Sequence, residues 1–220
     1  LLDSRVGCVF DASGPVGTVV LQAPSQVKFD VSIIGRPAHA ALNPEDGINA
    51  IQVASKAISD LPFGRVDDVT TANIGIIRGG ESTNVVCDKV TLSGEVRSHC
   101  DEGAEKVASE FSTAFEKAAG EVGAKAEINQ RVMYRGYNIS EESRLMHLVK
   151  NALEETGRAM IPKTSMAATD ANILNSHGIQ CVALGMGYEH VHSTDESIAV
   201  EELLASVRLA YYLITSNQRY

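Results

Sequence analysis

Two side chains near opposite ends of the sequence, Asp11 and His192, could bind a metal ion. Histidine is the commonest metal ligand, and a carboxylate at the end of an apolar strand is costly unless it is paired or bound to a cation. His192 follows an apolar run and the loop that contains Gly185 and Gly187, a location where open α/β sheets bind ligands. Two ligands are fewer than the three that a catalytic zinc site takes from its protein.

Each of the two residues also has a purely structural explanation. Asp11 precedes Ser13, Gly14 and Pro15, so its carboxylate could close an Asx turn. His192 could belong to a polar loop before a helix, with the next hydroxyl residue as the cap. The sequence has no HExxH motif to decide between these explanations.

Four other polar residues could contact a substrate. His39 lies in a Pro-Ala-His-Ala loop, and it could equally be an exposed loop histidine. Asn84 and Arg97 bracket a predicted strand; Arg97 could bind a carboxylate through two hydrogen bonds or form an ordinary surface ion pair. Thr169 begins a short predicted helix, where it could help to bind an anion or simply cap the helix.

The middle of the chain has the pattern of a ferredoxin-like unit. Apolar residues alternate with polar ones from Gln26 onward, and apolar stripes of helical period follow Asn43 and Asp101, which we predict to cap two helices. The expected strands are residues 26–33, 70–77, 84–98 and 124–133. The order β-α-β-β-α-β over residues 26–133 is the ferredoxin-like arrangement.

The two ends of the chain have the pattern of one α/β domain that this unit interrupts. Residues 5–10 and 17–22 are predicted strands that end at glycine and proline. Residues 140–214 are predicted to form a helix, a loop, a short helix, a buried strand at 180–184, a glycine loop and a terminal helix. We therefore expect domain boundaries at 1–25, 26–136 and 137–220.

Composition excludes several classes of function. Of the 220 residues, 44% are hydrophobic, which is enough for a sizeable core, and no apolar stretch is long enough to span a bilayer. A net charge of -9 argues against binding to nucleic acid or to an anionic membrane surface. The four cysteines fit neither a zinc knuckle nor a compact disulfide framework, so we expect reduced thiols and a cytoplasmic protein.

Taken in order, the motifs of this chain resemble those of the M20 metallopeptidases, with the peptidase T-like branch as the nearest match. The shared motifs run from Phe-Asp-Ala-Ser-Gly-Pro-Val-Gly and Gly-Arg-Pro-Ala-His-Ala through Thr-Asn-Val-Val-Cys-Asp and Gly-Glu-Val-Arg-Ser to Thr-Asp-Ala-Asn and Gly-Tyr-Glu-His-Val-His-Ser-Thr-Asp-Glu. The resemblance covers essentially the whole chain. It implies an α/β fold in which a two-metal aminopeptidase-type catalytic domain is interrupted by a ferredoxin-like βαββαβ lid.

The resemblance also implies roles for individual residues. Asp11 and His192 would each ligate one of two divalent metals, usually zinc, with cobalt and manganese as alternatives. His39 would act in trans, reaching the active site of the other protomer in a lid-mediated homodimer and polarising the scissile carbonyl. Asn84 and Arg97 would bind the carboxylate end of a small peptide, and Thr169, Gly185 and Gly187 would line the substrate pocket.

The resemblance places the remaining ligands and the general base upstream of the first residue. We therefore expect a C-terminal fragment that is inactive by itself and binds little or no metal, taken from a tripeptide aminopeptidase-like enzyme. Two alternatives stay open at this stage. One is an M20 amidohydrolase that cleaves N-acyl amino acids, and the other is a non-catalytic dimerisation module.

Overall fold

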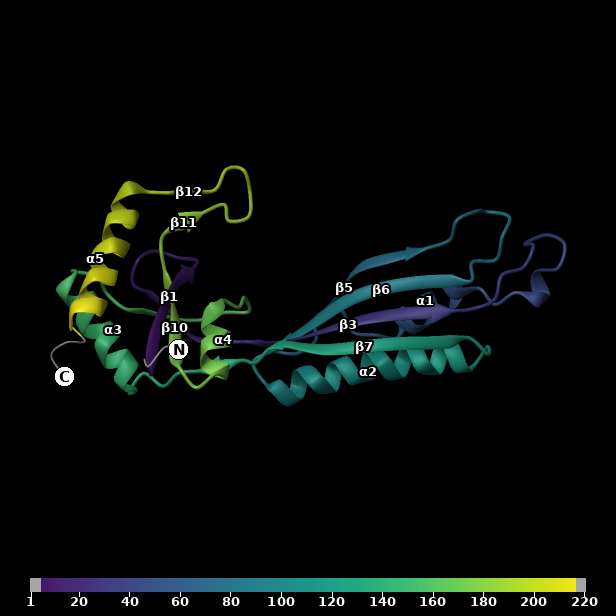
Figure 1. The fold of residues 1–220 in the computed structure, drawn as a ribbon, viewed down its shortest axis with the longest axis horizontal. Coiled ribbons are helices and arrows are strands. Elements are labelled where there is room, and N and C mark those ends of the chain that lie inside the picture. The colour runs from purple at the N-terminus through teal and green to yellow at the C-terminus, as the bar shows by residue number, and fades with distance from the viewer. Residues whose placement is uncertain (1–4, 217–220) are drawn as a thin grey trace. The chain divides into compact units, whose positions relative to one another are not determined.

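The computed structural model describes residues 5–216, which form two compact units. One unit, here called the α/β unit, holds the described residues up to Pro24 and from Tyr134 onward. The other, the ferredoxin-like unit, holds Ser25–Met133. Figure 1 shows the elements of each unit.

The ferredoxin-like unit has the predicted β-α-β-β-α-β order, with one additional strand of two residues after its first helix. Its strands are β3 (Ser25–Ile34), β4 (Gly64–Arg65), β5 (Thr70–Gly79), β6 (Lys89–Ser98) and β7 (Lys125–Tyr134), and its helices are α1 (Ala50–Ser59) and α2 (Asp101–Gly120). The strands lie in the order β4-β5-β6-β3-β7, and β3, β5 and β6 pair antiparallel. The sequence prediction of this fold is confirmed.

Alternation along β3 explains how this unit forms its core. Val27, Phe29, Val31 and Ile33 are all buried, while Lys28 between them is exposed. The apolar stripe of α2 covers the same face of the sheet, and its Phe111 ring packs against Phe29 with centroids 5.1 Å apart. One face of the sheet is therefore covered by helices, as binary patterning requires.

Helix α1 begins later than the sequence predicted. Asn43 precedes only a short 3₁₀ turn, η1 (Pro44–Asp46), and the cap of α1 is Asn49, whose Oδ1 accepts a 2.9 Å hydrogen bond from the N–H of Ile51. The reason is that both backbone groups of Ile48 bond to Arg36 and so cannot join a helix. The prediction that Asn43 caps this helix is wrong.

Two other predicted boundaries need correction. Asp101 lies inside the first turn of α2 and Cys100 occupies the cap position, so Asp101 favours the helix through its charge at the positive end of the dipole. Strand β6 begins at Lys89 and not at Asn84, because residues 84–86 pair with the loop around Ala38 and Ala40.

The α/β unit is built on a mixed sheet with the order β1-β10-β2-β8, to which β9 adds beside β2. Its strands are β1 (Val6–Ala12), β2 (Thr18–Ala23), β8 (Tyr137–Asn138), β9 (Ile161–Thr164) and β10 (Gln180–Gly185). Helices α3 (Arg144–Glu155), α4 (Asp170–Ser176) and α5 (Val200–Ser216) pack on it, and β11 (Tyr188–Glu189) pairs with β12 (Ser197–Ile198). The predicted buried strand at 180–184 is confirmed.

None of the described helices is long and apolar enough to cross a membrane. The four cysteines are free thiols, of which Cys87 and Cys181 are buried and Cys100 is exposed.

Candidate active site

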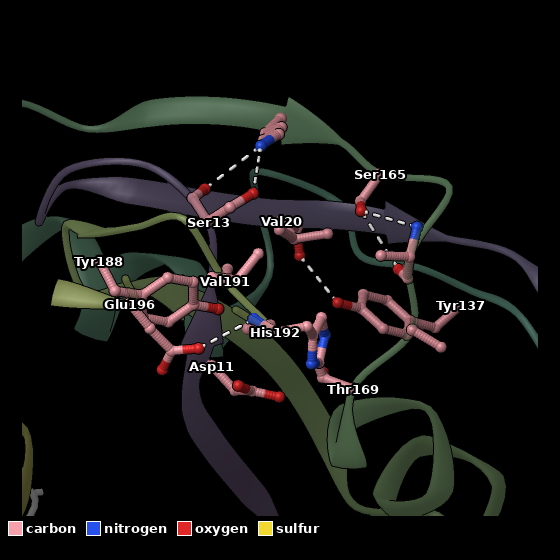
Figure 2. A pocket seen from close by; sticks show the side chains of 15 residues that line it. Asp11, Ser13, Val20, Tyr137, Ser165, Thr169, Tyr188, Val191, His192 and Glu196 are labelled. Carbon is pink, nitrogen blue, oxygen red and sulfur yellow. Dashed lines mark hydrogen bonds between the residues drawn. The ribbon is translucent and has the colours of Figure 1, made fainter. Parts of the chain in front are cut away.

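A pocket of about 410 Å³ in the α/β unit brings together Asp11 and His192. The two side chains come from opposite ends of the chain, and Figure 2 shows them on the same side of the pocket with Tyr188 and Glu196 nearby. Strand β1 runs parallel to β10, so the C-terminal ends of the two strands lie side by side. Asp11 lies at the end of β1, and His192 lies in the turn of the β11–β12 hairpin that follows β10, which explains why they meet.

Asp11 reaches the pocket because β1 is irregular at this position. Phe10 pairs with Leu184 and Ala12 pairs with Gly185, so Asp11 is an extra residue that has no partner on β10. A bulge of this kind re-aims a side chain, and Asp11 is exposed while its neighbour Ala12 is buried.

His192 lies in a strained part of the loop. Its φ is 62°, and that of His190 is 55°, in the left-handed region that L-residues other than glycine rarely adopt. The backbone N–H of His192 donates a 2.9 Å hydrogen bond to Oε2 of Glu196, and the Ser193 hydroxyl donates a 2.6 Å bond to the carbonyl of His190. Strain of this type is commonest where a protein must hold a functional side chain in place.

The pocket is negatively charged on the side of Asp11. Partial burial raises the pKa of the Tyr188 hydroxyl, and the negative charges of Asp11 and Glu196 and a hydrogen bond to Asp11 raise it further. Tyr188 therefore stays a neutral donor beside a carboxylate. Two carboxylates and an imidazole facing one cavity favour a cation.

The residue types fit a divalent metal, but the number of ligands falls short. Asp11 offers carboxylate oxygens and His192 an imidazole nitrogen, which are ordinary ligands for zinc, cobalt or manganese. Over residues 5–216, no three Asp, Glu, His or Cys side chains gather closely enough to hold a metal ion. A catalytic metal site at this pocket would need at least one ligand more than these two residues.

Gly185 and Gly187 shape the loops beside the pocket. A Cβ at Gly185 would lie 2.5 Å from the carbonyl oxygen of Pro15, and Gly187 has a φ of 78° and donates a 2.7 Å hydrogen bond to the carbonyl of Gly14. The structure therefore gives both glycines a packing role: they let the loop after β10 approach the loop after β1.

Glu202, at the start of α5, anchors the same pair of loops. Its Oε2 accepts a 2.6 Å hydrogen bond from the backbone N–H of Val16, and its Oε1 lies 2.8 Å from Nη1 of Arg158. The Glu202 side chain is 17% exposed, so these contacts are largely shielded from water. Sequence reasoning missed Glu202, because nothing in the helix pattern distinguishes it from the preceding Glu201.

Thr169 lines the pocket and caps α4. Its hydroxyl accepts a 3.2 Å hydrogen bond from the N–H of Ala171, and Asn172 completes a capping box with a 3.3 Å bond from the N–H of Thr169. Asn172 is buried and also donates to the carbonyls of Pro24 and Arg135. Of the two roles considered for Thr169, capping is the one with direct geometric support.

His39 and Asn84 lie together in the ferredoxin-like unit. The N–H of Ala40 donates to the carbonyl of Asn84, and residues 39 and 85 form an isolated bridge. Nδ1 of His39 accepts hydrogen bonds of 3.2 Å from the N–H groups of both Ala41 and Leu42. Nδ1 is thus an acceptor, so the neutral ring carries its proton on Nε2, which is left as the donor for a ligand.

Arg97 lies at the other end of β6. It pairs with Gln26, near the start of β3, and its Nε bonds to Oε1 of Glu95 at 2.8 Å. The length of β6 from Lys89 to Arg97 corresponds to about 27 Å at the rise of an antiparallel strand. Within one chain, Arg97 and Asn84 are therefore too far apart to bind the same small carboxylate.

Comparison with known proteins decides the family. The peptidase dimerisation domain of the M20 family matches residues 24–123, which is nearly the whole ferredoxin-like unit. The structure of aminopeptidase PepT from Bacillus cereus superposes with a TM-score of 0.89 at 40% identity, over 97% of this chain and 57% of that one. The chain belongs to the M20 peptidase family.

Two further relatives extend this comparison. A tripeptidase from Staphylococcus aureus superposes over 100% of this chain and 58% of its own, with a TM-score of 0.93 and 36% identity. The uncharacterised protein YqjE of Bacillus subtilis is 39% identical over 214 residues, which are 97% of this chain and 58% of that protein. This chain therefore spans little more than half the length of these proteins.

Sequence reasoning missed two pocket residues of this M20 chain, Tyr188 and Glu196. Both lie within the segment Gly-Tyr-Glu-His-Val-His-Ser-Thr-Asp-Glu, in which the resemblance to M20 peptidases predicts metal ligation by His192 alone. The hairpin of β11 and β12 brings the two ends of that segment together, which the sequence pattern did not predict.

Proposed function

We propose that this chain forms part of a metal-dependent hydrolase that removes residues from small peptides, with tripeptides as the expected substrates. The observation that carries the proposal is that Asp11 and His192 line one pocket in a chain of the M20 family. The names of two similar structures, an aminopeptidase and a tripeptidase, support the choice of substrate.

In this proposal Asp11 and His192 hold two divalent metals, with zinc as the expected metal. Bound metals of this kind polarise the scissile carbonyl and activate water for attack on it. The remaining ligands and the general base come from polypeptide outside the described residues. Tyr188 and Glu196 keep Asp11 and the loop of His192 in position, and neither is proposed as a ligand.

We further propose that the ferredoxin-like unit forms a homodimer and that His39 acts in the partner's site. Its Nε2–H is free to donate, because Nδ1 is already occupied by two backbone donors. Such a donor would stabilise the negative charge that develops on the carbonyl oxygen. The distance between Asn84 and Arg97 along β6 supports this arrangement. The two residues could contact the same substrate only if each came from a different protomer.

A second candidate function is hydrolysis of N-acyl amino acids. This chain is 31% identical over 131 residues to N-acetyl-L-cysteine deacetylase of Bacillus subtilis, and 30% identical over 137 residues to a chain of the p-aminobenzoyl-glutamate hydrolase of Escherichia coli. Both substrates contain an amide bond next to a carboxylate, so the residues proposed to act on a peptide would also act on them. A panel of tripeptides and N-acyl amino acids would separate the two candidates.

Calorimetric titration with Zn²⁺ tests the proposed metal site. The chain is titrated alone and then with an equimolar amount of the segment of the Staphylococcus aureus tripeptidase that this chain does not match. We expect tight binding only in the mixture, and we expect Asp11→Ala and His192→Ala to abolish it. Asp195→Ala is the control, because Asp195 lies in the same loop but does not line the pocket. Equal zinc affinity in all variants would refute the assignment.

A further inference from the structure

The chain passes between its two units twice, and the two crossings lie side by side in the α/β unit. The first crossing is Pro24, between the end of β2 and the start of β3. The second is residues 135–136, between β7 and β8. Strands β2 and β8 pair antiparallel, with Ala23 opposite Tyr137, so the two crossings adjoin neighbouring positions of one sheet.

The side chain of Asn172 contacts both crossings. Its Nδ2 donates a 3.0 Å hydrogen bond to the carbonyl of Pro24 and a 2.9 Å bond to the carbonyl of Arg135, both in the α/β unit. Carbonyl oxygens only accept, so the atom between them is the amide nitrogen, and its two hydrogens serve one crossing each. Asn172 is 1% exposed, so water does not compete for these bonds.

The amide oxygen of the same side chain bonds to the start of α4. It accepts a 3.3 Å hydrogen bond from the N–H of Thr169, whose hydroxyl accepts a 3.2 Å bond from the N–H of Ala171. Thr169 lines the pocket that holds Asp11 and His192 (Figure 2). One buried side chain therefore joins both crossings to a residue of the pocket wall through three hydrogen bonds.

We propose that Asn172 is a positioning residue that fixes Thr169 relative to both crossings and transmits a displacement of either crossing to the pocket. The crossings are the covalent connections of the ferredoxin-like unit to the α/β unit. A change in the direction of either crossing moves a carbonyl that Asn172 binds, and the fully bonded amide passes this movement to α4. In this way the ferredoxin-like unit affects the pocket through its chain connections.

A purely structural role, in which Asn172 only stabilises α4, is the alternative. Asn175 is an example of such a role. Its Nδ2 donates to the carbonyls of Ala171 and Cys181 at 2.8 and 2.7 Å, and its Oδ1 accepts a 3.1 Å bond from the N–H of Cys181. These three bonds fix α4 on β10 and involve neither crossing, so Asn175 is the matched control for Asn172.

A double-mutant cycle measured by amide hydrogen exchange tests the coupling. Pro24→Ala loosens the first crossing, because proline fixes its own φ and alanine does not, while the carbonyl of residue 24 is kept. In the chain with Asn172 we expect Pro24→Ala to speed exchange of the Thr169 amide at least about threefold. In an Asn172→Asp background we expect Pro24→Ala to have no effect, since Asp keeps an oxygen for Thr169 and lacks the amide hydrogens that bind the crossings.

The same measurement defines the control and the contrary results. In an Asn175→Ala background Pro24→Ala should still speed exchange at Thr169, because the bonds of Asn172 to the crossings remain. A Thr169 amide that does not respond to Pro24→Ala in the wild type, or that responds equally in the Asn172→Asp background, would overturn the proposal. Equal loss of the response in the Asn172→Asp and Asn175→Ala backgrounds would assign Asn172 a structural role and also overturn it.

A second measurement, on the unaltered chain, does not depend on the variants folding. We expect both side-chain amide protons of Asn172 to exchange at least about tenfold more slowly than those of Asn151, which is exposed on α3. Fast exchange of either Asn172 proton would show that one crossing is not held and would overturn the proposal. All of these measurements are made without zinc, so their outcome is independent of the proposed metal site.

Discussion

The carboxylate of Glu196 accepts a 2.9 Å hydrogen bond from the backbone N–H of His192, a residue whose φ of 62° is left-handed. This bond offsets part of the strain of that conformation, which costs about 1 to 2 kcal/mol for an ordinary L-residue. It also fixes the direction in which the imidazole leaves the backbone. We therefore regard Glu196 as a positioning residue for His192.

Replacing Glu196 by Ala should loosen this loop without unfolding the unit. We expect the His192 amide to exchange about threefold to tenfold faster with solvent, because one hydrogen bond of about 1 kcal/mol is lost. Nuclear magnetic resonance measures this rate directly. Glu196→Gln is the control, since its side-chain oxygen still accepts a hydrogen bond. Equal exchange rates in wild type and Glu196→Ala would contradict this role.

Removing the Glu202 side chain should destabilise the α/β unit. Glu202→Ala leaves the N–H of Val16 and the guanidinium of Arg158 without this carboxylate, and we expect a loss of about 2 kcal/mol in the free energy of unfolding. Urea unfolding, followed by amide signals of this unit, gives the value. Glu202→Gln should lose less, because it keeps an acceptor for Val16. A larger loss in Glu202→Gln than in Glu202→Ala would show that shape, not hydrogen bonding, matters at this site.

Gly94 in β6 should tolerate no side chain. A Cβ there would lie 2.3 Å from Cζ of Phe29 and 2.5 Å from the carbonyl oxygen of Asn73. Gly94→Ala should therefore lower the stability of the ferredoxin-like unit by about 1 to 3 kcal/mol through overpacking. Thermal unfolding measures this change.

Gly120 at the end of α2 provides the matched control for Gly94. A Cβ at Gly120 would meet no atom within 4 Å. Gly120→Ala should leave stability unchanged or raise it by up to about 1 kcal/mol, because alanine favours the helix. If both substitutions lowered stability equally, crowding around Gly94 would not be the cause.

The α/β unit should lose stability in alkaline solution. Burial raises the pKa of Cys8 from 9.0 to about 12 and that of Cys181 to about 11, and it raises the pKa of Tyr137 from 10.0 to about 12. The folded state thus holds these protons more tightly than the unfolded state. Stability from this source is complete below about pH 9 and falls as pH rises toward 12, by up to about 1.4 kcal/mol per pH unit for each group.

Urea unfolding at pH 8, 9 and 10.5 measures this dependence. Tyr137→Phe should make the loss above pH 10 shallower, although it also removes the 3.1 Å hydrogen bond from the Tyr137 hydroxyl to the carbonyl of Val20. A flat profile up to pH 10.5 would contradict the shifted pKa values of the two thiols.

The sequence by itself determined the ferredoxin-like fold, because its signals are local. The alternation of Val27, Phe29, Val31 and Ile33 is a property of one strand, and the apolar stripe of α2 is a property of one helix. Their chain order then restricts the topology to few choices. The ends of the helices were predicted less accurately. Asn43 was expected to cap α1, but because Ile48 pairs with Arg36, the cap is Asn49 instead.

Only the tertiary structure decided which residues share a site. Asp11 and His192 meet because β1 and β10 pair in parallel, which no local pattern specifies, and because a bulge turns Asp11 toward the pocket. Glu196 and Glu202 differ from other acidic residues through contacts that form on folding, with the backbone of His192 and with the backbone of Val16 and the side chain of Arg158. The sequence specifies residue types and local hydrophobic periodicity, whereas contacts between distant segments form only when the chain folds.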